Sequence, residues 1–145
     1  MNLADLLHNR LLINALASWC AAQIIKTIIY AIVNKRLDFE RLFGDGGMPS
    51  GHSATVTCLA VTAALEYGLD SAPFAIATVL AVIVMHDAMG VRREAGKHAA
   101  LLNEIVALLD NKTDPEVKLK VFLGHTPSQV LLGAVLGFVV AILLG

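Results

Sequence analysis

The sequence predicts an all-α fold, a polytopic membrane helix bundle with about four transmembrane helices plus one amphipathic helix between the third and the fourth. Of its 145 residues, 57% are hydrophobic and 16% are charged, and the mean hydropathy is +0.69. A soluble domain carries about a quarter charged residues. Apolar stretches long enough to cross a bilayer also recur along the chain. Because this length suits one domain, residues 1–145 are expected to form a single integral membrane domain.

The four predicted spans cover residues 11–33, 50–67, 73–89 and 127–145. Gln23 and Lys26 are polar exceptions within the first span. Small residues at 15–17 resemble a cleavage site, but the apolar run continues past them, so we expect this span to be retained. The short connector 68–71 predicts that the second and third spans form an antiparallel hairpin. Both cysteines lie in apolar runs and are expected to be packing residues.

Residues 92–109 have a different pattern. Apolar residues and His98 recur at the i, i+3, i+4, i+7 spacing of an amphipathic helix. This spacing predicts a helix that lies at the membrane interface or against the bundle. A loop is expected to follow at 110–115.

The cations predict the orientation of the chain. One side of the membrane would carry Arg10 alone, and Lys26 lies within a span. The other nine cations fall in two long loops: Lys35, Arg36, Arg41, Arg92, Arg93, Lys97, Lys112, Lys118 and Lys120. Positive charge favours the cytoplasmic side. The prediction is therefore a protein of the plasma membrane with both long loops cytoplasmic and both termini outside.

Three polar sites fall on this predicted cytoplasmic face, and the first opens the second span. Ser50 is a good N-cap, and the first N–H groups of a helix attract anions. Gly51 lets the backbone approach a ligand closely, and His52 projects from the same turn. The alternative is a plain helix start with His52 as an interfacial residue.

The second site opens the fourth span in a similar way. Thr126 is a candidate N-cap, and Gln129 would complete a capping box. Capping does not account for His125, which precedes the helix and can reach a ligand. Gly133 and Gly137 predict a close helix–helix contact through small residues.

The third site is a cluster of charges at the end of the third span. Arg92 and Arg93 suit multidentate binding of phosphoryl oxygens, although they are equally suited to anchoring the span. Asp87 is costly in an apolar helix, so we expect it to pair with one of these arginines or with a histidine. Lys26 can extend toward the same face or snorkel to the interface.

Residues in these sites resemble a known family. The second and third signatures of the type 2 phosphatidic acid phosphatases and vanadium-dependent haloperoxidases are similar to residues 49–53 and to residues 124–130 with Gly133 and Gly137. Residues 47–54 and 87–93 resemble the divergent bacterial and plastid branch of this family, and that narrower resemblance extends over nearly the whole chain.

The resemblance implies a metal-independent phosphoryl transfer without a cofactor. His125 would be the nucleophile that forms a phosphohistidine, and His52 would be the general acid. The implied phosphate-binding residues are Lys26, Ser50, Gly51, Arg92 and Arg93, with Asp87 and Gln129 as supporting residues. Such chemistry needs positioning, positive charge and proton transfer to the leaving oxygen.

The chain departs from the family pattern at three positions. Leu119 stands where the family has an arginine, and Gln129 stands where it has an aspartate that orients the nucleophile. Val33 replaces the arginine that would follow Lys26 in the first signature. The spacing of Arg92 and His98 also makes His98 an alternative nucleophile. We favour His125, because its neighbours match better and His98 falls on the apolar stripe.

The expected function is therefore a membrane phosphatase that acts on a lipid phosphate or polyprenyl pyrophosphate. The alternative is a non-catalytic membrane protein that binds or moves an anionic lipid with the same pocket. A third hypothesis is a metal site formed by Asp87, His52 and His125. The expected partners are a membrane lipid phosphate as substrate and no nucleic acid. Because four spans are fewer than the six-helix core of the family, a homodimer would supply the missing walls.

Overall fold

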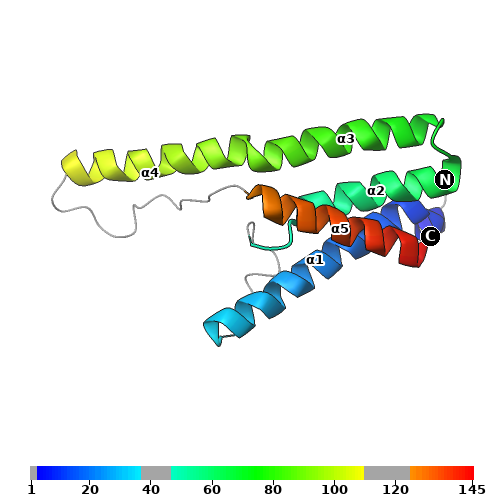
Figure 1. Ribbon diagram of the computed structural model, residues 1–145, viewed down its shortest axis with the longest axis horizontal. Helices are drawn as coiled ribbons and strands as arrows, with labels where there is room; N and C mark the ends of the chain where they lie inside the picture. Colours follow the sequence, from blue (N-terminus) through cyan, green and yellow to red (C-terminus); the bar gives the residue numbers. More distant parts are fainter. Residues whose placement is uncertain (1–2, 37–46, 110–124) are drawn as a thin grey trace.

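The computed structural model describes residues 3–36, 47–109 and 125–145, and within these ranges the chain forms helices and no strand (Figure 1). The elements are a short 3-10 helix η1 (Leu3–His8) and the α-helices α1 (Arg10–Asn34), α2 (Gly51–Tyr67), α3 (Ala72–Met89), α4 (Val91–Leu109) and α5 (Pro127–Leu144). The predicted all-α class is confirmed, and the predicted helices agree with these bounds to within a few residues. The loop expected at 110–115 lies outside the described residues.

Helix α2 lies at the centre of the bundle. It contacts α1, α3 and α5, whereas α1 and α3 do not contact each other within the described part of the chain. Its buried residues are mostly small: Gly51, Ser53, Ala54, Val56, Cys58, Ala60, Thr62 and Ala63. Because the neighbouring helices cover much of α2, it can carry several hydroxyl groups without exposing them to lipid.

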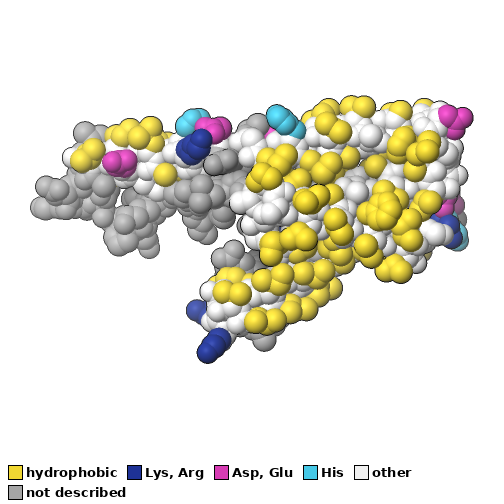
Figure 2. Space-filling view, in the orientation of Figure 1, with side chains coloured by type: hydrophobic (Ala, Val, Ile, Leu, Met, Phe, Trp, Pro, Cys, Tyr) yellow, Lys and Arg dark blue, Asp and Glu magenta, His cyan; other side chains and the backbone are white. Residues whose placement is uncertain are grey.

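The outer faces of the surrounding helices are strongly apolar (Figure 2). Large exposed side chains include Ile32 on α1, Ile76 on α3 and Leu143 on α5, each at least 70% exposed. By length and composition, three described helical segments could cross a membrane: Arg10–Asn34, Ala72–Val106 and Pro127–Leu144. Helix α2 has only 17 residues and is not one of them, so a fourth span remains a prediction.

Helix α4 continues almost in line with α3 and extends beyond the bundle (Figure 1). Helical hydrogen bonding passes through the junction, because the Gly90 N–H donates to the His86 carbonyl and the Gly90 carbonyl accepts from the Glu94 N–H. Among the described elements, α4 contacts only α3. Of the two placements predicted for this helix, packing against the bundle is therefore not observed.

Helices α2 and α5 pack closely through small residues, as predicted. A Cβ atom added to Gly133 would lie 2.9 Å from the Ser53 Cβ, and one added to Gly137 would lie 3.0 Å from the Cys58 amide nitrogen. Both distances are shorter than ordinary van der Waals contacts. The two glycines therefore allow the backbones to approach, which holds the start of α5 beside the start of α2.

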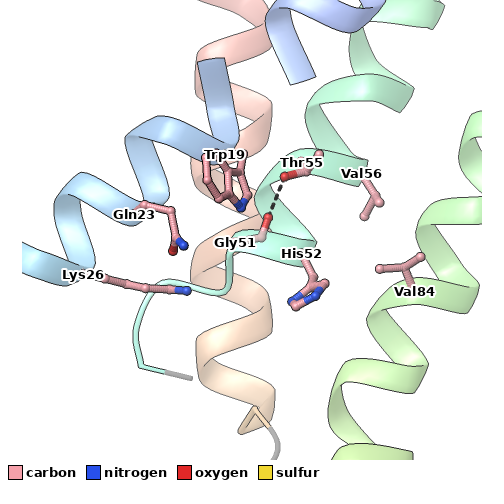
Figure 3. Close-up of a pocket in the computed structure, with 8 residues that line it drawn as sticks. All are labelled: Trp19, Gln23, Lys26, Gly51, His52, Thr55, Val56 and Val84. Atoms are coloured by element: carbon pink, nitrogen blue, oxygen red, sulfur yellow. Dashed lines mark hydrogen bonds between the residues drawn. The ribbon is translucent and has the colours of Figure 1, made fainter. Parts of the chain in front are cut away.

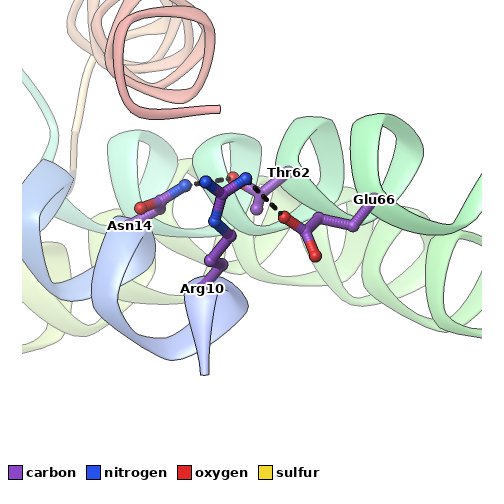
Figure 4. A network of polar contacts seen from close by, with 4 residues as sticks. All are labelled: Arg10, Asn14, Thr62 and Glu66. Atoms are coloured by element: carbon purple, nitrogen blue, oxygen red, sulfur yellow. Dashed lines mark hydrogen bonds and ion pairs between the residues drawn. The ribbon is translucent and has the colours of Figure 1, made fainter. Parts of the chain in front are cut away.

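Polar contacts fix α1 on α2 (Figure 4). At the end of the bundle near the termini, the Arg10 guanidinium forms an ion pair with Glu66 at 2.9 Å. One turn further along α1, the Asn14 amide donates to the Thr62 hydroxyl at 3.3 Å in a buried position. The Ser18 hydroxyl then donates to the Ala54 carbonyl at 3.0 Å. These contacts set the register of α1, which carries Lys26 toward the opposite end of the bundle.

Candidate functional site

Two histidines that are distant in the sequence lie together at the end of the bundle opposite the termini. His52 is in the first turn of α2, and His125 directly precedes the N-cap of α5. Their ring centroids are 6.0 Å apart, with 61° between the ring planes. His125 is buried, at 4% exposure, whereas His52 is half-buried. The structure thus brings together the two imidazoles that the sequence singled out.

His125 is held by its backbone and by its ring. Its N–H donates to the Ala88 carbonyl of α3 at 3.0 Å. Its ring nitrogen Nδ1 lies 3.2 Å from the Gln129 Oε1 atom. The same oxygen accepts from the Thr126 N–H at 3.1 Å, which completes the capping box predicted for α5. Gln129 therefore caps the helix and contacts the imidazole at once. The resemblance had already placed Gln129 where the family has the residue that orients the nucleophile, and the i, i+4 spacing agrees with this contact.

Ser50 shapes the turn before α2. Its hydroxyl accepts from the Ser53 N–H at 3.3 Å and from the Ser53 hydroxyl at 3.0 Å, and its own N–H donates to the Gln129 carbonyl at 3.0 Å. Because the residue is fully buried and these groups contact protein, Ser50 does not line the pocket described below. Its observed contribution is to join the start of α2 to the start of α5.

A pocket of about 390 Å³ lies on α2, between α1 and α3 (Figure 3). It is lined by Trp19, Gln23, Lys26, Gly51, His52, Thr55, Val56 and Val84. The first three lie on α1 at helical spacing, which places them on one face of that helix. The helical spacing of Trp19, Gln23 and Lys26 is visible in the sequence and could have revealed this face. The pocket combines a cation and an imidazole with an apolar wall.

Two positively charged groups lie close together in this pocket: the Lys26 ammonium group and the N-terminus of α2. A Cβ atom added to Gly51 would lie at an ordinary contact distance of 3.6 Å from the Lys26 Nζ atom, so the ammonium group lies close to this turn. The N-terminus of α2 adds the positive end of its helix dipole. None of the residues lining this pocket is Asp or Glu. The electrostatics therefore favour an anion in the pocket.

Other predicted residues are less closely associated with this site. Arg92 and Arg93 lie in the first turn of α4, about one turn beyond the Ala88 carbonyl that binds His125, but their side chains are outside the described part. Asp87 is exposed and forms no ion pair with any described side chain, so its predicted pairing is not found there. Leu119 lies outside the described residues.

The structure does not support the two alternative sites, which use His98 as the nucleophile or a bound metal ion. His98 is exposed on α4, and α4 contacts only α3 among the described elements, so His98 is separate from the two paired histidines. No three His, Cys, Asp or Glu side chains in the described ranges lie close enough to hold a metal ion. The hypothetical metal site of Asp87, His52 and His125 is therefore not formed in this structure.

The architecture is that of a helical membrane protein with a pocket at one end of its bundle that contains a lysine and a histidine. Comparison with known proteins identifies the family: residues 7–140 match the model of the Divergent PAP2 family, and the chain belongs to that family. A similar protein is the "Uncharacterized membrane protein YuiD" of Bacillus subtilis (strain 168), which is 40% identical over 152 residues. That comparison covers 97% of this chain and 96% of the relative. No solved structure matches the chain.

Proposed function

We propose that this protein is a membrane phosphatase that hydrolyses a lipid phosphate or polyprenyl pyrophosphate at the cytoplasmic face. The main support is the pairing of His52 and His125 at 6.0 Å beside a pocket that contains Lys26. A nucleophile, a proton donor and a cation are the groups that phosphoryl transfer requires. Membership of the Divergent PAP2 family supports a phosphatase-related role.

The proposed reaction has two steps. In the first step, the Nε2 lone pair of His125 attacks phosphorus while the bond to the leaving oxygen breaks and protonated His52 donates its proton to that oxygen. In the second step, neutral His52 takes a proton from water. The hydroxide oxygen that results attacks phosphorus, and the N–P bond to His125 breaks. The net change is hydrolysis of one phosphate ester or anhydride bond, with both histidines restored and no metal required.

The pocket suits an amphiphilic substrate. Lys26 and the start of α2 would bind the phosphoryl oxygens, and Arg92 and Arg93 are proposed to complete the phosphate-binding group. The apolar wall is formed by Trp19, Val56 and Val84. Because α1 and α3 do not contact each other, no described helix–helix contact closes the pocket between them. We propose that the apolar chain of the substrate lies along this gap and enters from the bilayer.

The test is phosphate release by the purified protein in detergent micelles. Phosphatidic acid and a polyprenyl diphosphate serve as substrates, and His125→Ala and His52→Ala are compared with wild type. We expect His125→Ala to reduce release to background and His52→Ala to reduce it about 10²-fold or more, the usual range for a general acid. His98→Ala is the matched control and should retain wild-type activity. Equal phosphate release by wild type and His125→Ala would contradict the proposal.

A second function is favoured by one observation: Gln129, which contacts His125, has a neutral amide and cannot stabilise an imidazolium by charge. A protein that only binds or moves an anionic lipid would keep the pocket without needing that charge. In this case, His125→Ala would leave binding to phosphatidic acid vesicles intact, whereas an Arg92→Ala, Arg93→Ala double variant would weaken it. Binding without turnover would select this second function.

A further inference from the structure

We infer that the pocket beside His52 holds the leaving group of the substrate, and that this leaving group is itself a phosphate bound by Lys26. The substrate is then a lipid diphosphate, in which two phosphates share an anhydride oxygen, rather than a lipid monophosphate. This assignment rests on the proposed function and selects one of its two substrate classes.

The two paired histidines differ in their relation to the pocket. His52 is one of the residues that line it, whereas His125 is not. Reacting atoms in a productive complex lie about 3–3.5 Å apart. A phosphorus atom attacked by His125 must therefore lie beside that ring, at the edge of the pocket and not in its main volume. The pocket itself is left for another part of the substrate.

The geometry of phosphoryl transfer identifies that part. The attacking and leaving atoms lie roughly in line, on opposite sides of phosphorus. With His125 on one side, the leaving oxygen lies on the other side, where His52 would protonate it. The group bonded to the leaving oxygen then continues away from His125. The space that His52 lines is therefore the space for the leaving group.

The Lys26 ammonium group lies in this space. Its Nζ atom would be 3.6 Å from a Cβ atom added to Gly51, the residue before His52, and Figure 3 shows the side chain extending from α1 toward this turn. In a lipid monophosphate, the leaving oxygen is bonded to carbon, and the leaving group carries no charge. In a lipid diphosphate, it is bonded to a second phosphate, whose oxygens accept charge-assisted hydrogen bonds from an ammonium group. A cation at this position therefore suits the diphosphate.

The rest of the pocket continues the match. Val56 lies one turn further along α2 than His52, and it forms the apolar wall together with Trp19 and Val84. Imidazole, ammonium group and apolar wall thus correspond to the terminal phosphate, the second phosphate and the hydrocarbon chain of one molecule. None of the lining residues is Asp or Glu, so no carboxylate in the lining repels the second phosphate. The volume of about 390 Å³ is within the usual range for small-molecule sites.

The reaction is then hydrolysis of an anhydride. The bond between the terminal phosphorus and the bridging oxygen breaks as the bond from the His125 Nε2 atom forms. The bridging oxygen departs with the lipid monophosphate and takes the proton of His52, and water later releases inorganic phosphate from His125. Lys26 stabilises the negative charge that develops on the departing phosphate, so it contributes to kcat only when the leaving group is a phosphate.

Two substrates with the same chain test this assignment in detergent micelles: farnesyl diphosphate and farnesyl monophosphate. Lys26→Met should lower kcat for the diphosphate about 10- to 100-fold and leave kcat for the monophosphate unchanged. KM should rise for both, because the ammonium group attracts either headgroup. Lys97→Met, which removes an exposed cation of α4, is the matched control and should change neither kcat. An equal fall of kcat with both substrates would overturn the inference, since Lys26 would then act on the transferred phosphate.

Binding separates this inference from the proposed function. In His125→Ala the ligand is not consumed, and calorimetry should show at least about 10-fold tighter binding of the diphosphate than of the monophosphate. Adding Lys26→Met should abolish this preference, and adding Lys97→Met should keep it. If this pattern holds while wild type releases no phosphate, the diphosphate pocket stands and the phosphatase proposal fails. If His125→Ala binds both ligands equally, the inference fails even where wild type hydrolyses them. That comparison retains Lys26, so it decides whether or not Lys26→Met folds.

Discussion

Substituting Gly137 with alanine tests whether close packing of α5 on α2 holds the site together. The added Cβ atom would lie 3.0 Å from both the Ala54 carbonyl carbon and the Cys58 amide nitrogen, and closer still to the Ala54 carbonyl oxygen. All three are backbone atoms, which cannot rotate away as a side chain can. The methyl group can therefore be accommodated only if the two helices separate.

The size of the effect follows from these contacts. Restoring an ordinary carbon–oxygen separation requires the helices to move apart by roughly 1 Å. Overpacking of this kind costs about 1–3 kcal/mol, and we expect the upper part of that range because the backbone must move. A displacement of about 1 Å at the reacting groups also lowers catalysis by about 100-fold. Since α5 begins just after His125, both effects are expected together.

The assay combines unfolding of purified protein in detergent with phosphate release. Gly137→Ala should unfold at a clearly lower temperature than wild type and lose most activity. Val135→Ala is the matched control, because Val135 lies on the same helix and is 52% exposed. It should unfold close to wild type. If Gly137→Ala and Val135→Ala unfold at the same temperature, the close approach of α2 and α5 does not contribute to stability as argued.

Three further predictions address charge, buried polarity and orientation. Lys26→Met should raise the KM for phosphatidic acid about 10- to 100-fold, the loss expected for a charge-assisted hydrogen bond, whereas Lys97→Met should leave it unchanged. Thr62→Val removes the acceptor of the buried Asn14 amide and should destabilise the protein by about 0.5–2 kcal/mol in detergent unfolding, with no effect expected on KM. A membrane-impermeant thiol reagent should label Leu69→Cys in intact cells and Ser128→Cys only after the membrane is opened; the reverse pattern would contradict the proposed orientation.

Much of the fold could be predicted because the signals are local. The long run of α1 is mostly apolar, with few polar residues such as Gln23 and Lys26. Thr126, Pro127 and Gln129 mark the start of α5 through capping chemistry. The spacing of Gly133 and Gly137 predicted a close helix contact without identifying the partner. Such features depend on neighbouring residues, which the sequence displays directly.

The arrangement around α2 could not be predicted in the same way. Residues 50–67 contain no local pattern that indicates contact with three other helices. The sequence therefore predicted this segment as one of four similar spans. Helices α3 and α4 are continuous at Gly90. Glycine is common at helix ends, but here the backbone of Gly90 keeps the helical hydrogen-bond pattern. The N-cap role of Ser50 was predicted correctly. The hydrogen bond from its backbone N–H to the Gln129 carbonyl of α5 could be found only from the tertiary structure.

The same limit explains what the sequence revealed about the site. His52 and His125 could be selected because each precedes or opens a helix, but their proximity depends on α2 and α5 packing side by side. Trp19 could be selected only by its helical spacing from Lys26, and the side chain of Val84 has no functional group that would select it. Both line the pocket because α1 and α3 pack on either side of α2. Pocket walls are therefore harder to predict than the polar groups within them.

The central position of α2 also explains how a short bundle can build a polar site in a membrane. Hydroxyl groups such as those of Ser53 and Thr62 are fully buried rather than exposed to lipid, since neighbouring helices cover them. The N-terminus of this enclosed helix then places its positive dipole beside Lys26 and His52. Because α1 and α3 do not contact each other in the described part of the chain, the proposed substrate would bring its charge to the dipole while its apolar chain remains in lipid. Burial of α2 and access to its first turn are thus two consequences of one arrangement.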